Sequence, residues 1–256
     1  AFSSNSIAFS LANLVVTNLT GSIAIGRYGI GIDAGSTDIG TRNIFFPSLL
    51  IASGVETISD LTRAAPGWTH NIYADPKFFD SAALDFHLLS PAGFVSNGVW
   101  VTNAALPYSP AIDFGARTAA IGDEPAPNGS RVNTGPFGGT TEASKSRTDD
   151  WLFAISYGDG GALIQTGRLE WTGVNLGPGA TVDLQYSTNN GAAWSNIETG
   201  VDATLETYAW TPAFSYPSVL WRVVSSTNSA VASTNAKAFS VRMATNTAFN
   251  FYVNDG

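Results

Sequence analysis

The second half of the chain alternates short apolar segments with tight-turn sequences, a pattern that few folds other than packed β-sheets accommodate. In residues 181–187 (TVDLQYS) every second side chain is apolar, as in a strand with one buried face. Runs such as 158–161 (GDGG) and 189–191 (NNG) separate these segments and favour tight turns. The pattern predicts strands at 151–157, 168–173, 181–187, 206–211, 219–225 and 238–243. A series of short strands separated by turns predicts a β-sandwich.

The composition agrees with an all-β chain. Only 12 % of the residues are charged, against about 25 % in typical soluble domains. Gly, Ser, Thr and Asn make up the difference and suit strands and turns better than helices. The net charge of −8 argues against nucleic acid as a partner and against binding to an anionic membrane surface. The absence of Cys excludes a disulfide framework and a structural zinc site.

The sequence also bears on where the protein works. No apolar run approaches the roughly 18 residues that a membrane-spanning helix needs. The chain begins at Ala1 without Met and without a signal peptide, so either a signal was removed before Ala1 or the sequence is part of a longer chain. A core of this size needs no disulfide, so the lack of Cys is compatible with secretion. We expect an extracellular or cell-surface location.

The first half is less regular. Residues 7–17 and 21–32 are rich in apolar and β-branched residues and predict strands, whereas residues 48–65 have apolar side chains at helical spacing and predict a short helix. Residues 66–146 are rich in Pro, Gly, Asp and Asn, which predicts irregular structure with brief strands. The polar run 140–150 (TTEASKSRTDD) predicts the boundary between two modules.

Four motifs in the irregular region carry a resemblance to known proteins. They are ADPKF at 74–78, DFHLLSPAG at 85–93, SPAIDFG at 109–115 and EPAPNGSRVNTGPFGGTTEASKS at 124–146. Their order and spacing resemble the C-terminal closing segment of secreted right-handed parallel β-helix proteins in large bacterial surface chains. Only about three β-helix turns of roughly 20–25 residues would fit upstream of these motifs. The resemblance therefore implies either a truncated β-helix or a smaller body of the sandwich or jelly-roll kind.

The second half carries a resemblance of its own. The motifs are GRLEWTG at 167–173, VDLQYSTNNGAAWSNI at 182–197, YAWTP at 208–212 and VLWRVVS at 219–225. They resemble immunoglobulin-like or fibronectin-like modules of bacterial surface proteins. In that pattern Tyr186 and Trp194 pack across a hairpin whose turn is formed by Asn190 and Gly191.

These observations predict an all-β chain in three parts. A β-rich domain, truncated β-helix-like or sandwich-like, spans 1–146 and ends in the irregular closing segment 66–146. An immunoglobulin-like sandwich spans 151–244, and a terminal strand spans 245–256.

No group of residues typical of an active site is present, and no cofactor is expected. His70 and His87 are the only histidines, and without a metal-ligand spacing both are expected to be structural or exposed to solvent. Arg131 lies in the closing motif and is expected to be structural. Calcium is a weak possibility because no D-x-D-x-D-G loop is present, and Asp85 and Asp113 are expected instead to cap turns. The acidic residues considered for calcium are Asp75, Asp80, Asp85, Asp113, Asp123, Glu124, Asp149 and Asp150.

Aromatic and asparagine residues suggest contacts with sugars. Most of the seven tryptophans fall at predicted core positions on strands, but Trp68 and Trp100 lie in loop-rich sequence and are candidate glycan contacts. Asn18 and Asn128 match the N-x-S/T pattern of glycosylation sites.

The two ends of the chain suggest a function. Each carries an apolar segment that is expected to pair with another copy by strand addition, which joins copies head to tail. The residues concerned are Phe249, Phe251 and Val253 at one end and Ile7, Phe9 and Leu11 at the other. We therefore expect a non-enzymatic structural subunit or repeat unit of an extracellular filament or surface assembly. Two alternatives stay open, namely a carbohydrate-binding or adhesive surface module and a remnant polysaccharide lyase or hydrolase of the β-helix type.

Overall fold

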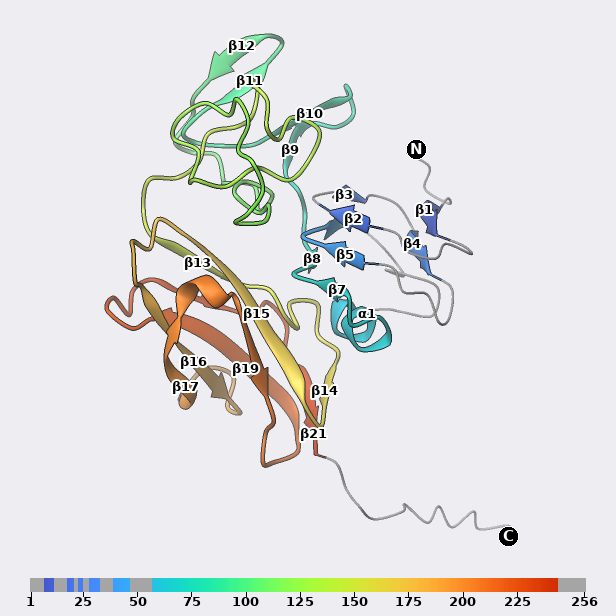
Figure 1. Ribbon diagram of the computed structural model, residues 1–256, viewed down its shortest axis with the longest axis vertical. Coiled ribbons are helices and arrows are strands. Elements are labelled where there is room, and N and C mark those ends of the chain that lie inside the picture. The colour runs from blue at the N-terminus through green and yellow to red at the C-terminus, as the bar shows by residue number, and fades with distance from the viewer. Residues whose placement is uncertain are drawn as a thin grey trace.

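The computed structural model describes residues 7–11, 18–20, 23–24, 28–32, 39–46 and 57–243. Strands dominate these ranges, and their helices are α1 (Ile58–Ala64) and the single 3-10 turn η1 (Ala203–Leu205), so the predicted all-β class is confirmed. Each described sheet consists either of strands before residue 102 or of strands after residue 150. Figure 1 shows the larger sandwich strands at the bottom, the short N-terminal strands on the right and the irregular segment above.

The first eight strands are short and pair in parallel. They are β1 (Ile7–Leu11), β2 (Asn18–Thr20), β3 (Ile23–Ala24), β4 (Tyr28–Ile32), β5 (Ile39–Thr41), β6 (Ile44–Phe45), β7 (Trp68–Thr69) and β8 (Ile72–Tyr73). β1 pairs with β4, while β2, β5 and β7 form one stack and β3, β6 and β8 another. Ile7 pairs with Tyr28 and Ile23 with Ile44, 21 residues later in each case. Each winding of the chain therefore stacks on the previous one, unlike the antiparallel sheets of a sandwich or jelly roll.

A helix interrupts the regular winding. Ile44 pairs with Ile72, so this step along the chain is 28 residues, and α1 lies in the longer connection. Thr57 caps α1, because its hydroxyl accepts the Asp60 N–H at 3.2 Å. The helix predicted within residues 48–65 is found in the second part of that range, and residues 47–56 lie outside the described residues.

The closing segment is irregular, as predicted. After β7 and β8 its strands form two hairpins, β9 (Phe78–Asp80) with β10 (Asp85–Leu88) and β11 (Phe94–Ser96) with β12 (Val99–Val101), and residues 102–150 contain no strand or helix. Side-chain hydroxyls replace strand pairing there. Ser144 donates to the carbonyl of Leu88 and Ser109 to that of Pro76, each at 2.6 Å, which supplies partners for buried backbone groups. The segment covers a core of Ile44, Ile72, Leu88, Ala111, Ile112, Phe114 and Ile155.

Two sheets form the C-terminal sandwich. The smaller contains β13 (Trp151–Ala154), β15 (Gly167–Val174) and β18 (Thr207–Trp210). The larger runs in the order β14 (Ala162–Ile164), β21 (Phe239–Arg242), β19 (Tyr216–Ser225), β16 (Thr181–Ser187) and β17 (Ser195–Asp202), with β20 (Ala232–Thr234) also paired to β19. Trp171 and Trp221, one from each sheet, are fully buried in the shared core. The predicted β-sandwich is confirmed, although β14, β17 and β20 were not among the six predicted strands.

The hairpin between β16 and β17 corrects one prediction. Asn190 and Gly191 have the expected positive φ values of 56° and 85°. Tyr186, however, packs on Trp210 with 5.6 Å between ring centroids, whereas the ring of Trp194 lies 4.2 Å from the guanidinium carbon of Arg222. Arg222 follows the buried Trp221 in β19 and faces outward. The two aromatic rings therefore pack on opposite faces of the sheet and not on each other.

Candidate functional site

A buried ion cluster joins the first module (residues 7–150) to the sandwich (residues 151–243). Its centre is Glu206, which follows η1, and three guanidiniums of the first module approach its carboxylate. Arg131 Nη1 lies 2.5 Å and Arg117 Nε 3.2 Å from Glu206 Oε1, while Arg42 Nη2 contacts Oε2. The side chains of Arg42, Arg131 and Glu206 are all buried.

Hydrogen bonds complete the coordination of the arginines. Arg131 donates from Nε and Nη2 to the carbonyl of Gly115, at 3.1 and 2.5 Å, and from Nη1 to the hydroxyl of Thr172 at 2.6 Å. Arg42 Nη1 donates to the carbonyl of Phe114 at 3.3 Å. This geometry fits the structural role expected for Arg131, because Nη1 binds Thr172 and Glu206 of the sandwich while Nε and Nη2 bind Gly115 of its own module.

The electrostatics keep the cluster ionised. Burial opposes the charged form of Glu206, but the charges of Arg131, Arg42 and Arg117 outweigh it and lower the pKa of Glu206. Burial also lowers the pKa of Arg131 to about 10, and the charge of Glu206 counteracts this. Removing one member of such a cluster leaves its buried partners without compensation.

Glu170 makes a second contact between the modules. Its Oε2 accepts the backbone N–H of His70 at 2.8 Å, and His70 Nε2 lies 3.0 Å from the carbonyl oxygen of Glu206. Burial lowers the pKa of His70, although the charge of Glu170 acts in the opposite direction. Within the described residues Glu170 Oε1 accepts no hydrogen bond. The guanidinium atom Arg168 Nη1 lies 3.6 Å from Oε1, and the ring nitrogen His70 Nδ1 lies 3.9 Å from it.

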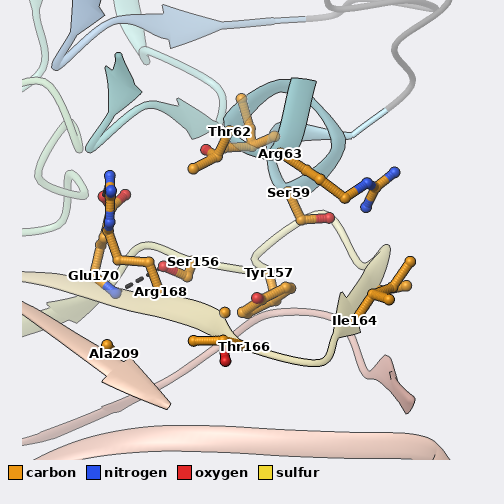
Figure 2. Close-up of a pocket in the computed structure, with 13 residues that line it drawn as sticks. Ser59, Thr62, Arg63, Ser156, Tyr157, Ile164, Thr166, Arg168, Glu170 and Ala209 are labelled. Atoms are coloured by element: carbon orange, nitrogen blue, oxygen red, sulfur yellow. Dashed lines mark hydrogen bonds and ion pairs between the residues drawn. The ribbon is translucent and has the colours of Figure 1, made fainter. Parts of the chain in front are cut away.

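A pocket of about 280 Å³ opens beside Glu170, between α1 and the sandwich. Figure 2 shows Arg168 and Glu170 together at one end of the pocket and Ile164 at the other. The walls between them include Ser59 and Thr62 from α1 and Tyr157 and Thr166 from the sandwich. The pocket therefore combines a buried ionic end with an apolar end.

A second cleft, of about 420 Å³, lies between the closing segment and β13. Here the guanidinium carbon of Arg147 lies 4.6 Å from the ring centroids of both Tyr108 and Trp151. Burial raises the pKa of Asp113, which also lines this cleft, to about 6, although the bond from Ser146 Oγ opposes the shift. Because Arg147 covers both aromatic rings, these side chains serve the contact between the modules.

The two candidate glycan contacts lie in different environments. Trp68 is 0 % exposed in β7, so its predicted contact with a glycan is wrong, because a fully buried ring offers no surface to a sugar. Trp100 is 42 % exposed on β12, with Lys145 Nζ 4.9 Å from its ring. Its contact with a glycan stays a prediction.

The predicted terminal strands also differ. Ile7, Phe9 and Leu11 lie in β1, which pairs along one edge with β4 of the same chain, and the predicted pairing of this segment with another copy stays a prediction. Phe249, Phe251 and Val253 lie outside the described residues.

The two predicted glycosylation sites lie in a strand and in a turn. Asn18 begins β2, and the Asn128 side-chain amide donates to the carbonyl of Glu124 at 3.3 Å. Attachment of sugar to either residue stays a prediction.

The remaining polar candidates form local contacts. His87 Nδ1 lies 2.6 Å from Asp85 Oδ1, and the imidazole stacks on Phe137 with 3.7 Å between centroids. Asp85 also accepts the N–H of His87 at 3.1 Å, the turn capping that was expected. Across the described ranges no three His, Asp or Glu side chains are grouped so that they would hold a metal ion. Neither helix in those ranges has the length and apolarity that a bilayer crossing needs.

Sequence reasoning missed Arg42 and Glu206 of the ion cluster, and the neighbouring Glu170. Arg42 and Glu206 lie far apart in the sequence and belong to no recognisable motif, whereas Glu170 lies within the GRLEWTG motif at 167–173. The one available signal was the scarcity of charge: in a chain with 12 % charged residues, a charged residue inside a predicted strand is a candidate for a buried ion pair. Glu170 in residues 168–173 fits that description.

Comparisons with known proteins give only distant likenesses. No protein-family model and no curated protein matches the chain. Among solved structures, an Fn3-like protein from Clostridium thermocellum has a TM-score of 0.23 and 19 % identity, over 39 % of this chain and 93 % of that one. An engineered protein has a TM-score of 0.26 and 11 % identity, over 82 % of this chain and 42 % of that one.

Proposed function

We propose that this chain is a non-enzymatic structural unit of an extracellular assembly, in which the closing end of a parallel β-helix is fixed to a fibronectin-like sandwich. The observation that carries this proposal is the ion cluster around Glu206. Arg42, Arg117 and Arg131 of one module meet a single carboxylate of the other. Buried charges of this kind set one orientation between the modules, because any other orientation leaves them unpaired.

The parallel stack supports the β-helix part of the proposal. Its strands recur after 21 residues at the first step and after 28 at the step that contains α1, with one strand directly above the next. The first step is close to the turn length of roughly 20–25 residues in solenoids of this kind. Each turn of a solenoid contacts only its neighbours. A stack of this kind extends by adding turns, which suits an elongated surface protein.

The first turn also suggests how copies associate. Within the described residues β1, β2 and β3 pair on one side only, with β4, β5 and β6. An open strand edge is a template for pairing with another chain. We propose that residues 245–256 of a second copy supply that strand through Phe249, Phe251 and Val253, which gives a head-to-tail contact and an open filament.

Light scattering and electron microscopy of the full chain test this proposal. We expect the mass to grow with protein concentration and filaments to be visible. Deletion of residues 247–256 should leave monomers, and the triple substitution of Phe249, Phe251 and Val253 by Ser, which keeps the length, should do the same. A full chain that stays monomeric at every concentration contradicts self-association, and a truncated chain that forms the same filament contradicts the assigned strand.

A further inference from the structure

We propose that the pocket between α1 and the sandwich is a binding site for one neutral sugar ring, held by Glu170 and Arg168. The site is separate from the ion cluster at Glu206 and from the strand edge, so the inference does not depend on self-association. It starts from a buried carboxylate with a vacant acceptor. The Glu170 side chain is 3 % exposed, it lines the pocket, and its Oε1 accepts no hydrogen bond among the described residues. Oε1 has almost no accessible surface, so a ligand reaches this carboxylate only when the side chain turns toward the pocket. Because a buried acceptor without a hydrogen bond costs free energy, a donor from a bound molecule would then be stabilising.

The charges at the pocket select the class of ligand. Arg168 Nη1 lies 3.6 Å from Glu170 Oε1, so this end of the pocket carries one negative and one positive group side by side. A cationic ligand is repelled by the guanidinium of Arg168, and an anionic ligand is repelled by the carboxylate of Glu170. Neighbouring hydroxyl groups both donate and accept hydrogen bonds, so a neutral polyhydroxyl compound satisfies the two charged groups at once.

The rest of the pocket fits the carbon skeleton of a sugar. Ile164, which is 41 % exposed at the other end of the pocket, offers an apolar contact for ring C–H groups. Ser59 extends from α1 into the space above Tyr157 and supplies a further hydroxyl. The volume of about 280 Å³ lies just below the roughly 300–1,000 Å³ of sites for drug-sized ligands. The pocket therefore holds a single ring, either a free monosaccharide or the end unit of a glycan.

Saturation-transfer NMR on the full chain tests the site with named probes. The neutral probes are D-glucose, D-galactose, D-mannose and L-rhamnose, and the charged counterparts are D-glucosamine and D-glucuronate. We expect at least one neutral sugar to bind and to compete with the others, and the charged analogue of the same ring to bind more weakly. Maltotriose and cellotriose distinguish a glycan end, which a trisaccharide would occupy, from a site restricted to free monosaccharides.

Two pairs of variants locate the binding. Arg168→Gln should weaken binding about tenfold or more, because a charge-assisted hydrogen bond is lost, whereas Arg242→Gln, at the exposed last position of β21, should have no effect. Ala209→Leu places a larger side chain at the pocket wall and should abolish binding, whereas Ala232→Leu on the exposed strand β20 should not. Circular dichroism and thermal unfolding confirm that each variant is folded. The proposal is overturned if none of the sugars binds, or if Arg168→Gln and Ala209→Leu bind a sugar as the unmodified protein does.

Discussion

At the scale of single residues, one buried carboxylate connects two segments that are distant in the sequence. Asp159, in the turn between β13 and β14, accepts the N–H of Ile58 at the start of α1, with 2.8 Å between nitrogen and Oδ2. Its Oδ1 accepts no hydrogen bond among the described residues. Burial therefore outweighs the hydrogen bond from Ile58 and raises the pKa of Asp159 from 3.8 to about 6.

This raised pKa predicts a pH-dependent stability. Between pH 4 and 6 the folded protein binds more protons at Asp159 than the unfolded chain, so the contribution of Asp159 to the free energy of unfolding falls as the pH rises through this window. The raised pKa of Asp113 acts in the same direction. The lowered pKa values of Glu206 and His70 act in the opposite direction. Asp159→Asn keeps an acceptor for the N–H of Ile58. It should reduce the decrease in the free energy of unfolding between pH 4 and 6 by on the order of 3 kcal/mol. Urea unfolding at a series of pH values measures this.

A suitable control is Asp80→Asn. Asp80 is exposed and also accepts a backbone N–H, that of Ala83 at 3.0 Å. This variant should keep the slope of the unmodified protein between pH 4 and 6. An unchanged slope in Asp159→Asn would contradict the assignment of the titrating group.

At the scale of elements, the closing segment shows how a long stretch without strands stays ordered. Its buried hydroxyls bond to backbone carbonyls, and its glycines allow close approaches between chain segments. Gly129 has φ +55°, and a Cβ at this position would lie 2.5 Å from Asp113 Cγ. Gly98 has φ +74°, but no atom lies within 4 Å of the position its Cβ would take. Gly98 is therefore a matched control for the backbone conformation.

Substitution of these two glycines by Ala separates backbone strain from steric overlap. Gly98→Ala should cost roughly 1–2 kcal/mol, because only the left-handed backbone is penalised. Gly129→Ala should cost a further 1–3 kcal/mol or so, because the methyl group also displaces the Asp113 carboxylate. Urea midpoints of the two variants give the comparison. If both variants lose the same free energy of unfolding, the Asp113 carboxylate moves away from the new methyl group without an energetic penalty.

At the scale of the whole molecule, the ion cluster makes the two modules dependent on each other. Arg42 and Arg131 reach across the junction to Glu206, and Glu170 and His70 add a neighbouring contact. A boundary between modules is evident in the sheets, since no described sheet contains strands from both sides. We therefore expect the modules to unfold together while the cluster is intact.

Glu206→Gln tests this coupling. Removing the charge leaves Arg42 and Arg131 buried without a counter-ion and should lower the free energy of unfolding by about 3–5 kcal/mol. Tryptophan fluorescence and circular dichroism should coincide in urea for the unmodified protein and separate in the variant. Glu198→Gln, at an exposed position of β17, should change neither the midpoint nor the coincidence. A Glu206→Gln variant as stable as the unmodified protein would rule out a role of the cluster in joining the modules.

The alternation in residues 181–187 located β16 with its observed bounds, because side-chain alternation and turn residues are local properties of a strand. The composition fixed the all-β class for the same reason. The sequence also indicated the irregular closing segment and a structural Arg131, since Pro, Gly and Asp act on the nearest residues.

The tertiary structure alone decided what depends on distant partners. The parallel stacking depends on which strands pair among the first eight. The sequence does not show these pairings, so it left both a truncated β-helix and a sandwich-like body open. Trp68 is buried in β7, which pairs with β5, although its sequence context predicted a loop. Arg42 and Glu206 are 164 residues apart, and no local pattern relates them. The pairing of these charges follows from the packing of the two modules, which brings together side chains that neither module could bury alone.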